Sequence, residues 1–442
     1  MITLPPLFER RLQQRYHRLV MDHLSPADQV ASGLRSLPNV ASSMAHTQAA
    51  YRFWCNEDVT LPQLVQPLLV AARDSIPLSC KHYALVVHDW SRLPYNSHSR
   101  KTDRVSLSKT NDLGYELQSA LLVSDQGDPL APVYLGLRAA DGVHSTTSDQ
   151  VELALSQLDG LAPVMSRIHD LDWSKPVVHI IDREADSVGH YRDWAQADYQ
   201  FLVRADDERM VMHEGTEKPL SALVASLRQS NAFRQTREVT YHGRKATQWV
   251  AETTVILTRP ARPQRADGKR VTIPGPPLPL RLVVAEVRGN DGHVLAVWLL
   301  LTILPIAVDA ATIALWYYWR WQIESFFKLL KSAGQHVEEW QQETAGALAR
   351  RLLVVAMACV VVWRLQRQTE PAAEKVRKLL IRLSGRQMKH RVEATAPALL
   401  AGLWILLAML EVLEHNSLDE LRELAREVGL ASPSADSSRV LV

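Results

Sequence analysis

The chain has 442 residues, enough for two to four domains at the roughly 150 residues that an average domain takes. Hydrophobic residues make up 47% and charged residues 22%, so the chain can bury a sizeable core, which excludes a disordered or fibrous protein. The formal net charge of +2 argues against a uniformly basic partner of polyanions. Cys55, Cys80 and Cys359 lie far apart and predict neither a disulfide framework nor a cysteine zinc site, which favours a reducing cytoplasm.

The apolar stretches do not indicate a membrane protein. Met1–Arg11 has no apolar core of the kind that a signal peptide needs. Leu352–Trp363 and Ala398–Leu410 are the longest apolar runs, and both fall short of the ~20 residues that span a bilayer. We therefore expect both to be buried core helices, with no membrane partner.

The balanced net charge hides a segregation of charges along the chain. Lysine and arginine gather in residues 1–20, 91–110 and 364–391, whereas residues 411–427 are mainly acidic. Any one such run is explained by a solvated helix face. Several separate basic segments in a nearly neutral chain indicate local surfaces that contact phosphates.

The first half of the chain begins helical and then alternates strands with helices. Residues 1–78 read as helical, with breaks near Pro26 and Pro38. Short β-branched apolar runs then predict strands, and runs with a helical period predict helices between them. In chain order these are strands Tyr83–His88, Tyr115–Val123 and Ala131–Leu137, helix Ser148–Leu171, strand Pro176–Ile181, helix Ser187–Trp194 and strand Tyr199–Val203.

The second half begins with a β-rich segment and ends in helices. Strands are predicted at Thr236–Tyr241, Gln248–Leu257 and Leu280–Val287, around an exposed Pro-, Arg- and Gly-rich loop. After a strand at Trp298–Thr302, one strong helix is predicted over Asp309–Gly334. The predicted divisions are a helical N-terminal domain (1–78), an α/β core in two parts (79–205 and 296–365), a β-rich insertion (206–295) and a helical C-terminal region (366–442).

The predicted helix Asp309–Gly334 has unusual proportions. Its polar side chains fall within an arc of about 80° at 100° per residue, and nearly all others are large and apolar. A surface helix normally shows the reverse, a narrow apolar stripe and a broad polar face. A structural ion-pair stripe and a cleft with a functional carboxylate both explain this pattern. The residues of the arc are Tyr317, Arg320, Glu324, Lys328 and Lys331.

Two aspartates add to the glutamate of this helix. Asp89 and Asp182 each follow a predicted buried strand, so with Glu324 they form a set of oxygen ligands. Mg²⁺ and Mn²⁺ favour such ligands, and two of these metals can promote an in-line phosphoryl transfer. The basic side chains of the same helix would hold phosphates beside the metals. Taken singly, each aspartate is also explained as a turn or cap residue.

These residues resemble a known family. The pattern Tyr317-x2-Arg320-x3-Glu324-x6-Lys331 is similar to the Tyr-Arg-Glu-Lys signature of the insertion-sequence-four family of bacterial DDE transposases. The run from Asp182 to Asp186, which reads Asp-Arg-Glu-Ala-Asp, resembles the second-aspartate motif of that family, and Asp89 resembles its first aspartate. Further similarity lies at Ala50–Phe53 with Asn56, which resemble the N-terminal domain of the family, and at Trp298–Thr302 with Pro305. The resemblance implies that residues 1–78 bind DNA and that the C-terminal helices of residues 366–442 are a candidate dimer contact.

The resemblance implies a fold and roles for individual residues. The family has a ribonuclease H-like core interrupted by a β-strand insertion, in agreement with the α/β pattern and the insertion predicted above. By resemblance, the three carboxylates of Asp89, Asp182 and Glu324 are catalytic and bind two Mg²⁺ ions, for which Mn²⁺ can substitute. Side chains implied to contact DNA are Tyr317, Arg320, Lys331, Lys328, Arg204 and Trp298. For Trp298, on which a flipped base would stack, core packing is an equal alternative.

The implied activity is cut-and-paste DNA transposition. One strand is nicked at the transposon end, a hairpin forms and opens, and the free 3′-hydroxyl joins target DNA. The implied partners are double-stranded DNA, as inverted-repeat ends and target, and a second copy of the chain in the DNA complex, with a cytoplasmic, nucleoid-associated location. Two alternatives stay open: a catalytically silent DNA-binding regulator derived from a transposase, and a metal-dependent nuclease that only hydrolyses DNA on the same core.

Overall fold

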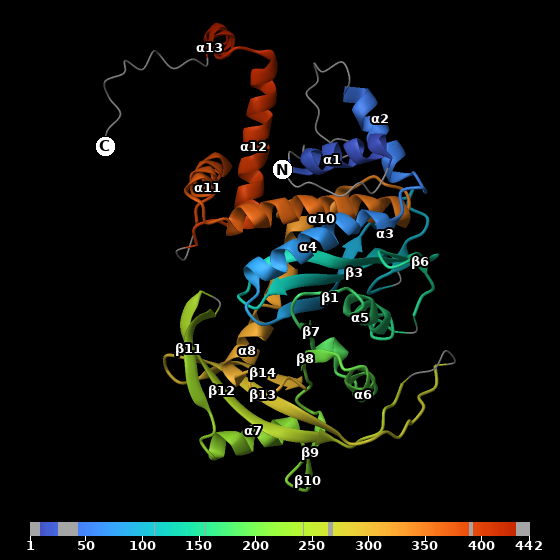
Figure 1. Cartoon of the computed structure of the whole chain (residues 1–442), viewed down its shortest axis with the longest axis vertical. Helices are drawn as coiled ribbons and strands as arrows, with labels where there is room; N and C mark the ends of the chain where they lie inside the picture. The colour runs from blue at the N-terminus through green and yellow to red at the C-terminus, as the bar shows by residue number, and fades with distance from the viewer. Residues whose placement is uncertain are drawn as a thin grey trace.

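The computed structural model describes residues 9–24, 43–109, 111–154, 156–241, 243–263, 268–388 and 392–429. In Figure 1 a layer of helices crosses one end of a large sheet, and toward the opposite end the strands spread apart near a short helix, α7 (Leu220–Gln229). The mixed α/β class that the sequence predicts is confirmed. The predicted breaks near Pro26 and Pro38 lie outside the described residues.

The sheet is built around three buried central strands. β1 (Ala84–Pro94) pairs antiparallel with β3 (Leu113–Ser124) on one side and parallel with β7 (Val177–Ile181) on the other. The apolar, β-branched sequence of β1 and β7 suits strands that are covered on both faces. Continuing outward, β4 (Pro129–Ala139) pairs antiparallel with β3, and β8 (Gln200–Arg204) pairs parallel with β7. The full order in this 14-stranded sheet is β10-β9-β12-β13-β14-β8-β7-β1-β3-β4-β5-β6, with β11 on β12 and β2 (Val105–Ser106) on β3.

Helices cover the sheet and divide the core into two clusters. The larger cluster joins the N-terminal helices and α10 (Ala345–Arg367) to β1, β3 and β4, and the smaller one lies mainly around α5, α6 and α7. Thr60 caps α3 in a capping box, which fixes the start of this helix. The next helix, α4, packs on β4. The helices of these layers are α1 (Arg10–Leu24), α2 (Ser43–Trp54), α3 (Leu61–Leu64), α4 (Gln66–Ser79), α5 (Leu161–His169) and α6 (Val188–Gln196).

The β-rich segment continues the central sheet. β14 (Val294–Thr302) crosses the predicted boundary at residue 296. It pairs with β13 on one side and with β8 through Leu300↔Arg204 on the other, so the residues predicted as insertion and those predicted as core share one hydrogen-bonded sheet. This pairing leaves no free edge at the junction, because every strand there has a neighbour. The three strands predicted in this segment are confirmed, and β9, β10 and α7 are additions that the sequence did not predict. The elements are β9 (Met210–His213), β10 (Thr216–Pro219), α7 (Leu220–Gln229), β11 (Arg234–Tyr241), β12 (Arg244–Leu257), β13 (Leu278–Gly289) and β14 (Val294–Thr302).

The predicted helix Ser148–Leu171 is wrong in its first half. Residues Asp149–Val151 form a short strand, β6, which pairs with β5 (Gly142–Ser145). Among the described residues of this segment, only Leu161–His169 are helical. Pairing at the edge of the sheet therefore overrides the apolar spacing of this segment, which by itself suits a helix.

The long helix predicted at Asp309–Gly334 is also wrong in detail. It divides into α8 (Ala310–Tyr318) and α9 (Trp321–Leu330), with Trp319 and Arg320 between them. Trp319 packs against Gly127 in the turn between β3 and β4, and the Gln322 side chain donates to the Gly127 carbonyl at 2.8 Å. Contacts with this turn hold the two helices at their junction, which a period-based prediction cannot detect.

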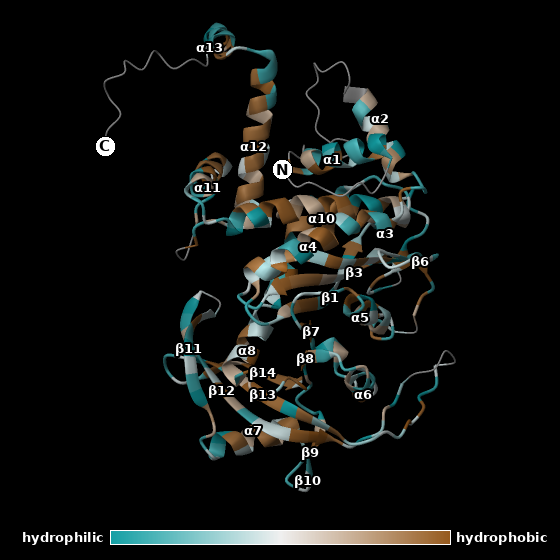
Figure 2. Cartoon of the chain, viewed as in Figure 1, coloured by the Kyte–Doolittle hydropathy of each residue, from teal (hydrophilic) through white to brown (hydrophobic). Residues whose placement is uncertain are grey.

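The C-terminal helices differ in burial. The helix α10, which contains Leu352–Trp363, is almost wholly buried, as predicted. The prediction of burial is wrong for Ala398–Leu410, because α12 (Ala396–His415) buries only residues near its start and projects from the body (Figure 2). By length and composition alone, α10 and α12 could each cross a membrane. Beside α12 lie α11 (Pro371–Ser384) and α13 (Leu418–Glu427).

Replacing Gly127 tests the contact that holds α8 and α9. Gly127 has a φ of +97°, and an added Cβ would lie 2.6 Å from the indole of Trp319. Backbone strain and the clash together should lower the free energy of unfolding of Gly127→Ala by about 2–4 kcal/mol in urea denaturation. Gly215→Ala is the control, because φ is +75° there and an added Cβ meets nothing within 4 Å. An equal loss of unfolding free energy in both variants would contradict the packing of Trp319 on Gly127.

Candidate active site

The two aspartates lie side by side because of strand register. His88 of β1 is opposite Ile181 of β7 in the parallel pair, so the residues that follow, Asp89 and Asp182, are neighbours. The prediction that the first strand ends at Asp89 is wrong: β1 continues to Pro94, because β3 goes on pairing with it beyond the end of β7. Asp89 accepts a hydrogen bond from the amide of Trp90 at 2.8 Å, which helps to fix its carboxylate.

Asp182 ends β7 and opens a short 3₁₀ turn, Arg183–Ala185. Its side chain accepts the Arg183 amide at 2.6 Å and so caps the turn. Asp186, at the end of the same motif, has a supporting role that the sequence did not reveal. It accepts the Tyr191 hydroxyl at 2.9 Å and pairs with Arg209 at 3.0 Å. These contacts fasten the motif to α6 and to the chain beyond β8.

The junction of α8 and α9 brings the third carboxylate to the aspartates. Arg320 is buried, with 8% of its side chain exposed, and its guanidinium contacts an oxygen of all three acids. The distances are 2.7 Å from Nη1 to Asp89 Oδ2, 3.2 Å from Nη2 to Asp182 Oδ2 and 3.4 Å from Nη2 to Glu324 Oε1. One cation therefore joins residues that are more than 230 positions apart in the sequence. The structure thus brings Asp89, Asp182, Glu324 and Arg320 together.

Tyr317 completes this cluster from the last turn of α8. Its hydroxyl donates to Asp182 Oδ1 at 3.1 Å, and its ring lies 5.8 Å from the half-buried ring of Trp298 on β14. Burial, together with the charge of Asp182, raises the pKa of the Tyr317 hydroxyl far above its ordinary value of 10. Tyr317 therefore stays protonated and acts as a hydrogen-bond donor.

The other basic residues selected from the sequence lie around this cluster. Arg204, the last residue of β8, is close enough for its charge to lower the pKa of Tyr317. The ammonium of Lys331 donates to the Arg92 carbonyl at 2.5 Å and lies 3.2 Å from Glu338, so its contacts are with β1 and the chain after α9. Lys328 is exposed on α9. In the part of the chain that the structure describes, neither lysine forms an ion pair with the three carboxylates.

Burial and the neighbouring charges have opposing effects on the pKa values of the site. Burial raises the pKa of Asp89 to about 6, and the charges of Glu324 and Asp182 add to this, while Arg320 and the Trp90 amide act in the other direction. For Arg320, burial disfavours the charged form, but Asp182, Tyr317, Asp89 and Glu324 together raise its pKa above the ordinary value. Three acids in one partly buried place therefore need a cation, which Arg320 supplies here.

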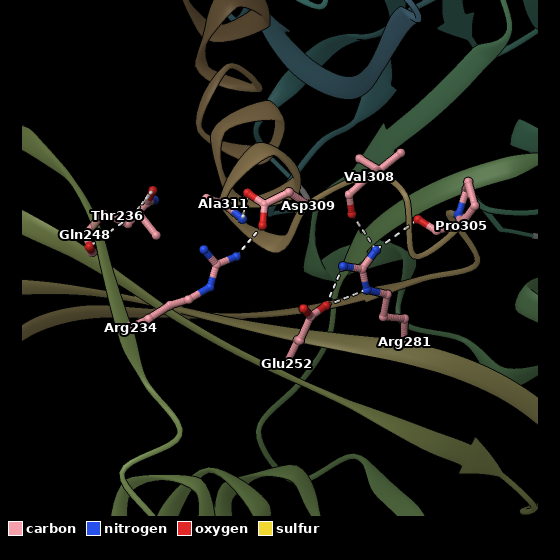
Figure 3. A network of polar contacts seen from close by, with 9 residues as sticks. All are labelled: Arg234, Thr236, Gln248, Glu252, Arg281, Pro305, Val308, Asp309 and Ala311. Atoms are coloured by element: carbon pink, nitrogen blue, oxygen red, sulfur yellow. Dashed lines mark hydrogen bonds and ion pairs between the residues drawn. The ribbon is translucent and has the colours of Figure 1, made fainter.

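The insertion holds the start of α8. Figure 3 shows Arg281 of β13 reaching the turn before α8, where it donates to the carbonyl of Val308 at 2.6 Å and to that of Pro305 at 3.1 Å. From β11, Arg234 pairs with Asp309, whose side chain also caps α8 by accepting the Ala311 amide at 3.1 Å. Strands β11 and β13 thus hold the start of α8, the helix that carries Tyr317 and leads to Arg320.

A second group of potential metal ligands lies elsewhere. Asp103, Asp141 and His144 each offer a ligand atom, and these atoms are within 4.8 Å of one another. Asp103 already accepts the Tyr115 hydroxyl and, at 2.6 Å, the Ala345 amide at the start of α10. The sequence did not single out this group, and these contacts give Asp103 a structural role in joining α10 to β3.

The comparisons with known proteins address the same region. Residues 155–361 match a family model described as "Transposase DDE domain". This match supports a DDE transposase. The matched segment contains Asp182 and Glu324 and begins after Asp89. No curated protein matches the chain.

The raised pKa of Asp89 predicts a pH-dependent stability. The folded protein holds the proton of the Asp89 carboxyl more tightly than the unfolded chain does. The contribution of this proton to the free energy of unfolding is therefore complete below about pH 4 and is lost as the pH rises through about 6. Asp89→Asn cannot ionise. As the pH rises from about 4 to 8, the free energy of unfolding of this variant should therefore fall by about 2 kcal/mol less than that of the native chain. The measurement is urea denaturation with a chelator present. Parallel pH profiles would contradict the burial of an ionised Asp89.

Proposed function

We propose that this protein is a cut-and-paste DDE transposase of the insertion-sequence-four type. The observation that carries the proposal is the convergence of Asp89, Asp182 and Glu324 on one guanidinium, from three segments of the chain. The sheet order β4-β3-β1-β7-β8, antiparallel and then parallel, suits the ribonuclease H-like core that this type of enzyme would have. The location would be the cytoplasm, with the protein on the nucleoid when it is bound to DNA.

The donor set fits Mg²⁺ or Mn²⁺. All three ligand side chains are carboxylates, they converge on one place, and between 16% and 34% of each is exposed, so an ion and its waters can reach them. Hard divalent cations prefer such oxygens. When bound, two such ions would activate a water or a 3′-hydroxyl and neutralise charge on the scissile phosphate.

The remaining side chains would bind and orient DNA. The Tyr317 hydroxyl and the Arg320 guanidinium are donors suited to phosphate oxygens at the scissile position. Arg204, Lys328 and Lys331 would extend the positive charge along the strand. The half-buried ring of Trp298 lies beside Tyr317, and a flipped base could stack on it.

The proposed reaction is a series of in-line phosphoryl transfers. Water first cuts one strand at the transposon end and leaves a 3′-hydroxyl. That hydroxyl attacks the opposite strand to give a hairpin, a second water opens the hairpin, and the 3′-hydroxyl finally joins target DNA. No covalent bond between enzyme and DNA is required, in agreement with a Tyr317 that keeps its proton. The alternatives are a silent DNA-binding regulator and a nuclease that only hydrolyses.

Removing each carboxylate tests the assignment of the site. Asp89→Ala, Asp182→Ala and Glu324→Ala should each reduce cleavage of a mini-transposon substrate by at least about a thousandfold, because each removes a metal ligand. Binding of the transposon ends in a gel-shift titration should be kept. Glu184→Ala, in the same motif but exposed, is the control and should cleave normally. Full cleavage by any of the three variants would disprove the site.

The same assay separates the three candidate functions. Hairpins and joined target DNA support the transposase. Nicks alone, with Mg²⁺ and the proper ends present, support the hydrolytic nuclease. Binding without any cleavage supports the regulator.

We also propose that two copies pair on DNA through α12. Its outer face carries a row of apolar side chains that are 40–49% exposed: Ile405, Met409, Leu410 and Leu413. Burying this row against the same row of a second copy would stabilise the pair by about 25 cal/mol for each Å² of apolar surface removed from water. Two sites, each acting on one transposon end, require such a pair.

The double variant Met409→Glu/Leu413→Glu should test this contact. We expect it to bind single ends but to form at least about tenfold less of the complex that holds two ends, as resolved on native gels. Leu78→Glu is the control, since Leu78 is 85% exposed on α4. Normal two-end complexes, or binding of the native chain to lipid vesicles through α12, would contradict the proposal.

A further inference from the structure

The contacts of Arg320 raise a question of competition. Its two terminal nitrogens occupy the space between Asp89, Asp182 and Glu324, on oxygens that would also serve a metal. Mg²⁺ needs its ligand oxygens at about 2.0–2.1 Å in near-octahedral order. A guanidinium in that position is a like charge directly beside the incoming ion. Metal binding to these oxygens and the present contacts of Arg320 therefore exclude each other.

A guanidinium that leaves the acids needs another anionic partner. Burial disfavours its charged form, while the three acids favour it, so it would not remain unpaired at this depth. Phosphate is the matching partner, because its oxygens accept the two parallel N–H donors of arginine. The ring of Trp321, which is 54% exposed, lies 5.6 Å from the Arg320 guanidinium carbon, so the buried guanidinium already contacts a side chain that reaches the surface.

We propose that Arg320 is an exchangeable counter-ion that couples metal binding to DNA binding. It neutralises the three carboxylates until a divalent cation takes them over, and it then moves past Trp321 onto a phosphate of the DNA strand at the site. DNA that holds the guanidinium increases the affinity for metal, and metal that holds the acids increases the affinity for DNA, by the same factor. This inference rests on the proposed function. It adds that the complete site, with metal on the acids and the guanidinium on a phosphate, assembles only on DNA.

The coupling can be measured without any cleavage. The probe is Mn²⁺, titrated into the full chain in a calorimeter, with and without a short duplex of arbitrary sequence at low salt, where phosphate contacts dominate binding. A blank titration removes Mn²⁺ bound by the duplex itself. For the native chain we expect the duplex to tighten Mn²⁺ binding on the order of tenfold. An unchanged affinity would overturn the proposal with no variant needed.

Arg320→Gln should release the acids for metal. Without DNA its Mn²⁺ affinity should rise roughly tenfold over the native chain, and the effect of the duplex should fall to less than about twofold. Arg183→Gln is the matched control: it removes the same charge from the residue next to Asp182, but the Arg183 guanidinium is largely exposed and pairs with Asp206 at 3.8 Å. It should shift Mn²⁺ affinity less than about threefold and keep the coupling. If Arg320→Gln does not fold, Arg320→Lys, which keeps one charge without the fork, should give intermediate values.

The outcomes separate this inference from the proposed function. Equal Mn²⁺ affinity and equal coupling in the native chain and in Arg320→Gln would overturn the exchange and leave the metal site intact. The same shift in Arg183→Gln as in Arg320→Gln would show that general charge is responsible, which also overturns the exchange. Failure of both the native chain and Arg320→Gln to bind Mn²⁺, with Glu324→Gln as the negative reference, would overturn the proposed function itself.

Discussion

The parallel pairing of β1 with β7 is the constraint on which the site depends. Because His88 is opposite Ile181, two aspartates that are 93 positions apart become neighbours at one place in the sheet. A slip of one residue would turn one of the two carboxylates to the other face. The register is held by buried apolar side chains on both strands and by Asp125, whose carboxylate accepts the amides of Lys81, His82 and Tyr83 just before β1.

A second set of contacts brings the helices to this fixed pair. The turn between β3 and β4 meets Trp319, and the insertion holds the start of α8 through Arg281 and Arg234. The junction of α8 and α9 is therefore fixed from two sides, one in the core sheet and one in the insertion. The β-rich segment between Asp182 and Glu324 therefore does not loosen the site, because its strands continue the same sheet and its arginines reach the helix that the site uses.

The electrostatics of the site follow from this geometry. Three acids at the edge of the core repel one another, and burial makes each charge more costly. The structure balances them with one arginine, and the raised pKa of Asp89 shows that the balance is incomplete. A site with a deficit of positive charge is suited to divalent cations and, next to them, to a polyanionic substrate. The near-neutral total charge of the chain is compatible with this, since the affinity for DNA would come from local surfaces.

The sequence by itself determined the residue types of the site and most of the central strands. Buried strands such as β1 and β7 have continuous apolar runs, and the polar arc on an otherwise apolar helix selected Tyr317, Arg320 and Glu324. Tertiary contacts decided what local periodicity cannot encode. They broke the long helix at Trp319, turned residues near Asp149 into an edge strand and left most of α12 outside the core. They also gave Arg320 its contacts with all three acids, because an ion pair between distant segments depends on strand register and helix packing, which only the folded chain establishes.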